Sequence, residues 1–302
     1  MKFDLILTNP PFQDRGKRGR TPHKLWIEFT ENSFEHLLAD GGTLCQVSPS
    51  SFQSPSNRIL ELLKNNDTRW IHLDTAGHFD GVASSFADYA VRKAPNPREG
   101  TEVTSGGQTF RVALDEGVMY LPNNLSAVAL EVHRKVIFDT AQKLVVERDY
   151  VTCHNIILKK VDPTLSKEQT DEHVHPVLHT NKQTWWSSIR QPWADEQKIM
   201  WSRSGYTLPF FDNGRLGGTD MVYFVRVPDE VAGRHLAEHL GSKLFRYIFK
   251  TAKWSGFGNE RVFDALPSLP LDKALTDEDL YNLFELTPEE VTHVEDQMGG
   301  DR

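Results

Sequence analysis

The chain begins with a short apolar run that stops at two consecutive prolines. Residues 3–8 read FDLILT, and Asn9, Pro10, Pro11 and Phe12 follow directly. A continuous apolar run of this length is typical of a strand that is buried on both faces of a parallel sheet. Proline has a fixed φ and no backbone N–H, so two in succession end the strand and leave carbonyl groups without neighbouring donors. The sequence therefore predicts a rigid turn beyond the carboxyl end of a strand, where open α/β sheets bind ligands.

The groups on this turn suit an aromatic amine as substrate. Asn9 offers a side-chain carbonyl, Pro10 a backbone carbonyl, and Phe12 a flat apolar ring. Two acceptors can bind both N–H bonds of an exocyclic amino group such as that of adenine, and this makes the nitrogen lone pair available. We therefore expect Asn9, Pro10, Pro11 and Phe12 to be the catalytic residues. A turn with no chemistry is the alternative.

Patterns typical of strands and of helices alternate over residues 1–95. Helical spacing of apolar residues covers 23–40 and 57–63, and short apolar runs occupy 43–49, 69–76 and 84–94. This order predicts an α/β fold with half of a mostly parallel sheet.

The sequence changes character twice after this region. Residues 95–120 are rich in Pro, Gly, Ser and Thr, which predicts a linker or protruding loop. Short strand-like runs appear from about residue 175, and a long helical pattern covers 230–254. We therefore predict three regions, with a sheet domain at 1–95, a linker and helical connection at 96–175, and a further domain at 176–302.

Composition and cysteine content favour a cytoplasmic protein. The chain is 38% hydrophobic and 25% charged, and no apolar run approaches the ~20 residues that span a bilayer. The amino-terminal residues have no basic flank and no cleavage site, so we expect neither a secretory signal nor a membrane. Cys45 and Cys153 stand without CxxC spacing. We expect no disulfide framework and no metal site.

Charge is unevenly distributed along the chain. The formal net charge of −8 argues against a protein that coats nucleic acid indiscriminately. Five basic residues nevertheless lie within residues 14–24, namely Arg15, Lys17, Arg18, Arg20 and Lys24. Contact with phosphate groups requires such a local basic patch. A solvated loop is the alternative.

Asn-Pro-Pro-Phe after an apolar strand resembles the catalytic motif of S-adenosylmethionine-dependent amino-methyltransferases, chiefly the DNA adenine methyltransferases of restriction-modification systems. Residues 23–55 are similar to the segment that follows the catalytic loop in these enzymes. Residues 78–93 (HFDGVASSFADYAVRK) are similar to a segment whose aromatic residue stacks on the other side of the base. By this match Phe86 is the second stacking residue, with Tyr89 as the weaker candidate.

Most of the remaining chain also resembles these enzymes. Residues 213–227, 242–272 and 277–291 look like their carboxyl-terminal target-recognition region. The resemblance implies a partial Rossmann-like methyltransferase sheet followed by an α+β target-recognition domain. It implies methyl transfer from S-adenosylmethionine to the amino group of an adenine flipped out of double-stranded DNA. Besides the basic residues at 14–24, DNA contacts are then expected from Arg203, Arg215, Lys243, Arg246, Lys250, Lys253 and Trp254.

One part of the family pattern is not found. The glycine-rich turn that binds the cofactor lies upstream of the catalytic turn in these enzymes, and only eight residues precede Asn9. We therefore expect a split or truncated enzyme, in which Asn9 lines the methyl end of the cofactor pocket and a companion chain carries the rest. Residues 3–8 should then form an exposed sheet edge.

Two other functions stay open on the sequence. If the cofactor-binding half is absent altogether, the alternative is a non-catalytic DNA-binding remnant or a specificity subunit of a restriction-modification system. Methylation of protein glutamine uses the same turn, usually with Tyr at the position of Phe12. The basic segment at 14–24 and the large carboxyl-terminal region favour DNA as the substrate.

Overall fold

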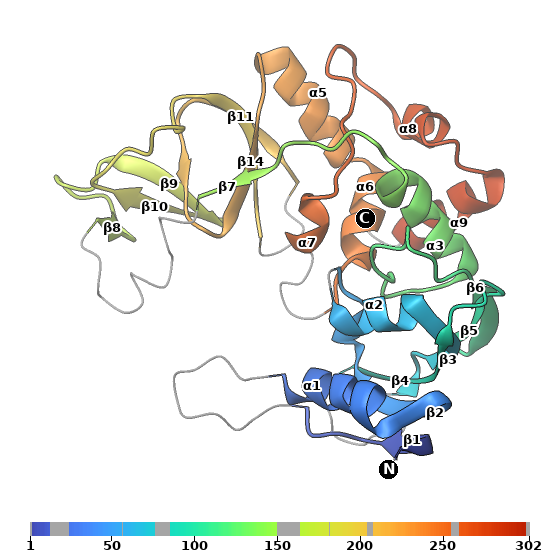
Figure 1. Cartoon of the computed structure of the whole chain (residues 1–302). Coiled ribbons are helices and arrows are strands. Elements are labelled where there is room, and N and C mark those ends of the chain that lie inside the picture. The colour runs from blue at the N-terminus through green and yellow to red at the C-terminus, as the bar shows by residue number, and fades with distance from the viewer. Residues whose placement is uncertain are drawn as a thin grey trace. The chain divides into compact units, whose positions relative to one another are not determined.

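The computed structural model describes residues 2–12, 24–55, 57–75, 85–149, 164–180, 182–203, 208–254 and 260–299. The chain forms two compact units (Figure 1). The first unit consists of Met1–Arg134 and Thr251–Gly258, and the second consists of Lys135–Lys250 and Asn259–Arg302. A mixed sheet with helices in the first unit, and separate sheets and helices in the second, confirm the predicted α/β class.

The division between the units differs from the predicted boundaries at residues 95 and 175. The chain returns to the first unit at Thr251–Gly258. There the Thr251 carbonyl accepts a hydrogen bond from the Asn123 N–H at 2.8 Å, and the Thr251 hydroxyl lies 2.8 Å from His133 Nε2. Because these contacts join residues more than a hundred positions apart, local sequence patterns do not indicate them.

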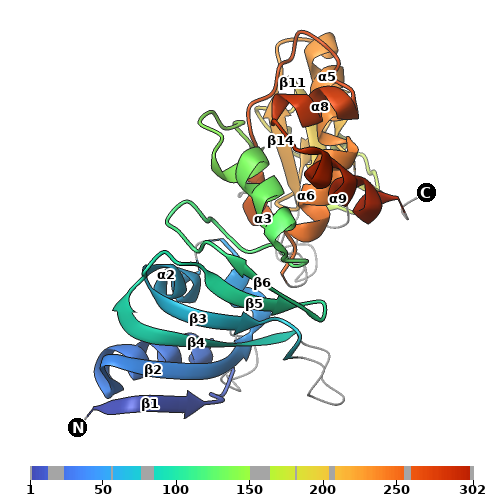
Figure 2. The ribbon, with the colours of Figure 1, turned by 90° about the vertical axis from the view of Figure 1, so that its right-hand side faces the viewer.

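Six strands of the first unit form one sheet in the order β1-β2-β4-β3-β5-β6 within the described residues (Figure 2). Their bounds are Phe3–Thr8 (β1), Leu38–Pro49 (β2), Asn66–His72 (β3), Phe86–Pro95 (β4), Thr101–Ser105 (β5) and Gln108–Val112 (β6). Strands β1, β2, β3 and β5 run in one direction, and β4 and β6 run in the other. The described strands therefore form a mixed sheet, with two parallel and three antiparallel pairings, which corrects the prediction of a mostly parallel sheet.

The hairpin β5–β6 corrects the expectation of a linker over residues 95–120. Its strands are joined at Gly106 and Gly107, which have φ of 58° and 73°. Positive φ at both positions is the geometry of a tight hairpin turn, and glycine adopts it without a steric penalty. The Asp74 carboxylate accepts both of these glycine N–H groups at 2.8 Å and so ties the turn to the end of β3.

Helices cover one face of this sheet. Helix α1 (Leu25–Asn32) continues into a wider turn at Ser33–Leu37, and α2 (Arg58–Asn65) begins where the Asn57 side chain accepts the Ile59 N–H. Figure 2 shows both helices on the same side of the sheet. Leu44 and Gln46 of β2 are buried on this side, and Gln46 Nε2 donates to the Thr30 hydroxyl of α1. The last helix of the first unit is α3 (Ala127–His133), which is capped by Ser126.

The second unit contains two further sheets within the described residues, in the orders β13-β9-β10-β8 and β12-β11-β14-β7. The strand bounds are Glu147–Arg148 (β7), Leu165–Ser166 (β8), His175–Thr180 (β9), Gln183–Ser187 (β10), Gln197–Ser202 (β11), Phe210–Asn213 (β12), Gly217–Gly218 (β13) and Val222–Arg226 (β14). The stacked rings of Trp193 and Phe224 pack against the core around Met200.

The helices of the second unit are α5 (Glu230–Leu240), α6 (Lys243–Thr251), α7 (Glu260–Phe263), α8 (Asp277–Leu283) and α9 (Pro288–Met298). The single long helix predicted over residues 230–254 is interrupted at Gly241, where α5 ends and a short turn leads to α6. Helices α8 and α9 each begin with a capping box, at Thr276 and Thr287. Among the described residues, no helix has the length and apolarity needed to cross a membrane.

Candidate functional site

The Asn-Pro-Pro-Phe turn lies at the edge of the sheet where the parallel strands end. It follows β1 directly, and β2 and β3 end at the same edge. Pro10 is buried, Phe12 is half-buried, and Asn9 and Pro11 are exposed. Pro10 therefore anchors the turn in the protein, and Asn9 faces outward.

The two expected acceptors are free of donors in the described part of the chain. No described residue donates a hydrogen bond to the Asn9 side chain or to the Pro10 carbonyl. Both groups lie just past the last paired residue of β1, Thr8, which pairs with Gln46. A pair of unsatisfied carbonyl oxygens beside an apolar ring can accept both hydrogens of an amino group. The catalytic role expected of Asn9, Pro10, Pro11 and Phe12 stays a prediction.

Phe86 lies against Phe12, and the base-stacking role that the resemblance gives it stays a prediction. The two ring centroids are 5.0 Å apart with an interplanar angle of 31°. Phe86 is the first residue of β4, and this strand runs opposite to β1, so its start lies at the same edge of the sheet. A planar base between two rings requires each ring at about 3.5 Å from the base, and thus rings about 7 Å apart. The pair must separate by about 2 Å before it can hold a base between its rings.

Tyr89, the weaker stacking candidate, is a core residue, and this expectation is corrected. Successive side chains of a strand point to opposite faces, so Tyr89 and Phe86 lie on different faces of β4. The Tyr89 ring is fully buried edge-on to Phe52, and its hydroxyl accepts a hydrogen bond from Gln46 Nε2 at 3.1 Å. Burial raises the pKa of Tyr89, which therefore stays protonated.

A polar cluster that sequence reasoning missed lies at the same end of the sheet. Asp88 Oδ2 on β4 is 3.4 Å from His72 Nδ1 on β3, and the Thr75 hydroxyl contacts Asp88 Oδ1. The His72 ring stacks on Trp70 with centroids 4.6 Å apart. Asp88 also raises the pKa of Cys45, although burial of the thiol is the larger cause. The pairing of β3 with β4 brings these residues together, and no short sequence motif predicts the cluster.

The basic segment at 14–24 is described only at its end. Arg15, Lys17, Arg18 and Arg20 lie outside the described residues. Lys24 is exposed immediately before α1, which places its side chain within reach of solvent or a bound partner. The expectation of phosphate contact by this segment stays a prediction.

Arg215 in the second unit is exposed on a turn that hydrogen bonds to Asp212 stabilise. The buried Asp212 carboxylate accepts the backbone N–H groups of Arg215 and Leu216 at 3.1 and 3.2 Å. Lys198 Nζ, itself fully buried, lies 2.7 Å from the same carboxylate. Burial lowers the pKa of Lys198, and the hydrogen bond that Lys198 donates to Asp212 opposes this effect. The buried pair holds the turn that presents Arg215.

Two other basic candidates of the second unit, Lys243 and Lys250, already have partners. Lys243 Nζ pairs with Glu295 at 2.5 Å, and this hydrogen bond raises the pKa of Lys243. Lys250 Nζ donates to the Gln297 carbonyl at 3.0 Å. Arg203 and Arg246 are half-buried. Contact of these four side chains with DNA stays a prediction, and for Lys243 it would compete with an ion pair.

Trp254 is a structural residue of the first unit, which corrects its assignment to DNA contact. Its indole is buried, donates Nε1–H to the Leu121 carbonyl at 2.6 Å and packs edge-on to Tyr120. The neighbouring Lys253 side chain is exposed, while its carbonyl accepts from Asn123 Nδ2 at 2.9 Å. Since indole has a single donor, the Trp254 ring has no polar group left for a phosphate.

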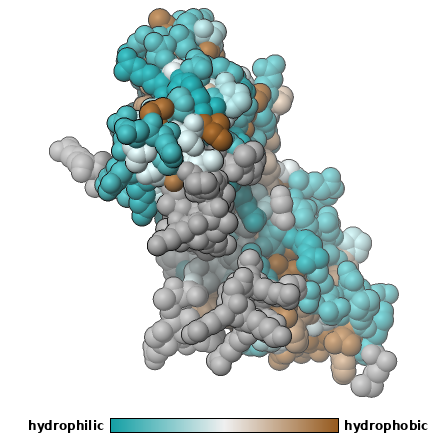
Figure 3. All heavy atoms as spheres, turned by 90° about the vertical axis from the view of Figure 1, so that its left-hand side faces the viewer, coloured by the Kyte–Doolittle hydropathy of each residue, from teal (hydrophilic) through white to brown (hydrophobic). Residues whose placement is uncertain are grey.

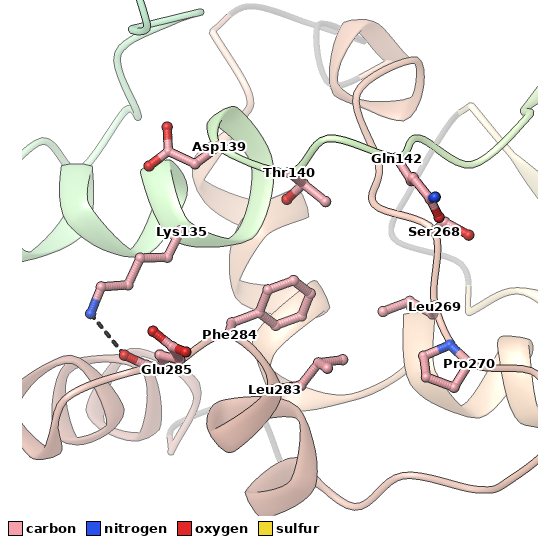
Figure 4. A pocket seen from close by; sticks show the side chains of 10 residues that line it. All are labelled: Lys135, Asp139, Thr140, Gln142, Ser268, Leu269, Pro270, Leu283, Phe284 and Glu285. Carbon is pink, nitrogen blue, oxygen red and sulfur yellow. Dashed lines mark hydrogen bonds between the residues drawn. The ribbon is translucent and has the colours of Figure 1, made fainter.

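An open groove of about 710 Å³ lies in the second unit (Figure 4). Its walls include Leu269, Pro270, Leu283 and Phe284. The one lysine of the lining, Lys135, is neutralised by the Glu290 carboxylate at 2.7 Å and also donates to the Glu285 carbonyl. None of the predicted site residues lines it. Among the described residues, no group of three or more His, Cys, Asp and Glu side chains could hold a metal ion.

No protein-family model and no curated protein matches this chain. Solved structures that resemble it include three restriction-modification proteins. The Type IIL restriction-modification enzyme MmeI in complex with DNA matches 84% of this chain at 10% identity and a TM-score of 0.45. A nuclease-deletion mutant of the Type ISP enzyme LlaGI with a DNA substrate mimic matches 88% at 9% identity and a TM-score of 0.49. The type IIG restriction endonuclease BpuSI matches 94% at 12% identity and a TM-score of 0.34. The chain spans 44%, 40% and 49% of these proteins, less than half of each.

Proposed function

We propose that this chain is the base-binding part of a DNA methyltransferase that transfers a methyl group from S-adenosylmethionine to the amino group of adenine. One observation carries the proposal. No donor among the described residues bonds the Asn9 side-chain oxygen or the Pro10 carbonyl, which follow the carboxyl end of β1, and the rings of Phe12 and Phe86 lie 5.0 Å apart at the same edge of the sheet.

Asn9 and Pro10 would act on the amino group of the substrate. Their oxygens accept its two N–H bonds, which orients the nitrogen lone pair away from the ring of the base. S-adenosylmethionine supplies an electrophilic methyl group when bound. The N–C bond forms as the S–C bond breaks, and the substituted nitrogen releases one proton to solvent. Asn9 and Pro10 contribute orientation, so no covalent intermediate on the protein is required.

Phe12 and Phe86 would hold the base in this position. A base inside a duplex cannot reach the turn, so it must leave the stack. Contact with aromatic rings replaces the lost stacking and is worth about 1–3 kcal/mol per base. Because the two rings touch each other here, the base enters by taking the place of their mutual contact.

Partners follow from the same proposal. Double-stranded DNA is the substrate. The exposed basic candidates within the described residues are Lys24, Arg215 and Lys253, together with Lys243 and Lys250, which already have partners. Asn9 would line the methyl end of the cofactor pocket, and a companion polypeptide would supply most of the rest, since no glycine-rich turn opens a helix after a buried strand among the described residues.

The direct test measures incorporation of a labelled methyl group into duplexes. The chain is co-expressed with the polypeptide encoded immediately upstream, and a matched duplex carries N6-methyladenine at every adenine. We expect incorporation into the unmodified duplex alone. DNA binding without incorporation would instead identify a non-catalytic DNA-binding or specificity protein, and label on protein would identify glutamine methylation.

A further inference from the structure

The open groove of the second unit has an acidic end and an apolar end. Figure 4 shows Asp139, Lys135 and Glu285 at one end, and Leu269 and Pro270 at the other. None of the residues that the proposed methyl transfer uses lines this groove. Its chemistry therefore has to be explained separately.

Asp139 stands at the C-terminal end of a helix. It directly follows the helical turn Arg134–Phe138, and its side chain is exposed. The C-terminal end of a helix carries a partial negative charge, so a carboxylate at this end is unfavourable. Lys143 lies close enough for the charge of Asp139 to raise its pKa, although burial lowers that pKa more. Its ammonium group, however, donates to the Ile137 carbonyl. Within the described residues the Asp139 carboxylate has no ion-pair partner.

Glu285 also follows the end of a helix, and it has a backbone conformation that favours glycine. The Glu285 N–H donates to the Asn282 carbonyl at 3.1 Å, and the Leu286 N–H donates to the Tyr281 carbonyl at 2.9 Å. These two bonds close a helix around a left-handed residue, which is usually glycine, and Glu285 has a φ of 51°. Both its backbone and its charge therefore oppose a glutamate at this position. This cost indicates that the carboxylate is used for something other than folding.

The lysine in the groove leaves both of these carboxylates without a counterion. Lys135 Nζ donates to the Glu290 carboxylate at 2.7 Å and to the Glu285 backbone carbonyl at 2.9 Å. Glu290 is buried, so this ion pair is internal to the protein. Among the described residues, no cation lies within ion-pair distance of the Asp139 or Glu285 carboxylate. Two carboxylates and two negative helix ends therefore favour a positively charged ligand at the acidic end.

The chain beside the groove is acidic as well. Residues 277–299, which include α8 and α9, contain eight Asp and Glu residues and no Lys or Arg. Such a surface repels the phosphate groups of nucleic acids and of lipids. A second copy of this chain is also disfavoured, because each copy carries a net charge of −8. The charge of the groove therefore fits a basic partner protein.

The apolar end and the open shape of the groove suit a polypeptide. Leu269 is buried in its wall, and Leu283 on its rim is 47% exposed. In contrast, the upper part of Figure 3 shows a face of the second unit that is largely hydrophilic (teal), with small and separate apolar spots (brown). Small-molecule sites enclose most of their ligand, whereas amphipathic segments of partner proteins bind in open apolar grooves.

We propose that this groove binds a basic amphipathic segment of a partner protein. A Lys or Arg side chain of the segment pairs with the Asp139 and Glu285 carboxylates, and its apolar side chains pack against Leu269 and Leu283. The unfavourable conformation of Glu285 is then the cost of placing a carboxylate in the groove. This interaction requires neither DNA nor a cofactor, so it does not rest on the proposed methyl transfer.

The test measures fluorescence anisotropy of a labelled peptide that is titrated with the full chain. The peptide consists of lysines and leucines, with the leucines at helical spacing. One control peptide has glutamate in place of lysine, and another has serine in place of leucine. We compare Glu285→Gly, Asp139→Asn and the double variant with Glu278→Gln, because Glu278 is an exposed acid of α8 outside the groove lining. Melting temperatures are measured for every variant.

We expect Glu285→Gly to melt at a higher temperature than the parent, because glycine adopts the left-handed conformation without strain, and yet to bind the lysine–leucine peptide more weakly. The double variant should weaken binding by about tenfold or more, and Glu278→Gln by less than about twofold. The glutamate peptide should not bind, and the serine peptide should bind more weakly than the lysine–leucine peptide.

Four results would overturn the proposal. They are no binding of the lysine–leucine peptide, unchanged binding by the double variant, an equal loss of binding in Glu278→Gln, and a Glu285→Gly chain that melts below the parent. The third would show attraction to the acidic surface in general, and the fourth would show that the Glu285 carboxylate stabilises the fold. None of these results bears on methyl transfer, which is measured separately.

Discussion

The buried ion pair beneath the Arg215 turn makes a quantitative prediction. Lys198 Nζ contacts the Asp212 carboxylate at 2.7 Å and the carbonyls of Ala194 and Glu196 at 3.0 Å each, and both members of the pair are buried. Lys198→Met keeps much of the side-chain volume but leaves Asp212 as a buried charge with only backbone donors. Removing one partner of a buried pair costs about 3–5 kcal/mol.

Hydrogen exchange of the β11 and β12 amides reports this cost, because the pair joins these two strands. Lys243→Met is the matched control, since Lys243 also forms an ion pair but its side chain is exposed. The control variant Lys243→Met should leave the exchange rates of the β11 and β12 amides unchanged. The double variant Lys198→Met/Asp212→Leu should be less destabilised than the sum of the single variants. A Lys198→Met chain within about 1 kcal/mol of the parent would refute a stabilising role of the pair.

Three further predictions concern the first unit and the pH response. Phe12→Ala and Phe86→Ala should each weaken extrusion of a 2-aminopurine base from the duplex by about 5- to 150-fold, the equivalent of about 1–3 kcal/mol. The fluorescence of 2-aminopurine rises when the base is extruded. A variant that gives the same rise as the parent would exclude a stacking role for its ring. Tyr89→Phe should cost about 1–3 kcal/mol of unfolding free energy in urea, because the buried Gln46 amide loses one of its two acceptors, and it should not change base extrusion. Burial lowers the pKa of His239 below its usual 6.5, so the unfolded chain takes up this proton first, and stability should fall as the pH drops below about 6.5. His239→Gln should flatten the plot of melting temperature against pH below about pH 6.5. An unchanged slope would argue against His239 as the group that causes the loss of stability.

The turn and the positions of the first strands along the chain could be predicted because their signals are local. Two prolines after FDLILT mark a strand end, and alternating apolar patterns locate β2, β3 and β4. The same alternation could have placed Tyr89 in the core, because residues three apart in a strand point to opposite faces. The β5–β6 hairpin also had a local signal in Gly106-Gly107, between two strands with alternating patterns.

Other features depend on contacts that local patterns do not contain. Trp254 is buried because the chain returns to Leu121 across 133 positions. The exposure of Leu5 and Leu7 depends on which strand stands beside β1, and an apolar run reads the same at an edge as in the centre of a sheet. The pairing of His72 with Asp88 depends on the register between β3 and β4.

The most direct measurement concerns Asn9. The chain co-expressed with the upstream polypeptide is assayed for methyl transfer to adenine, beside Asn9→Ala and the control Asn282→Ala at an exposed position of α8. The proposed function requires adenine methylation by the parent and the control, and a loss of about 100-fold or more in Asn9→Ala with DNA affinity unchanged. Methylation by Asn9→Ala at the parental rate would contradict it.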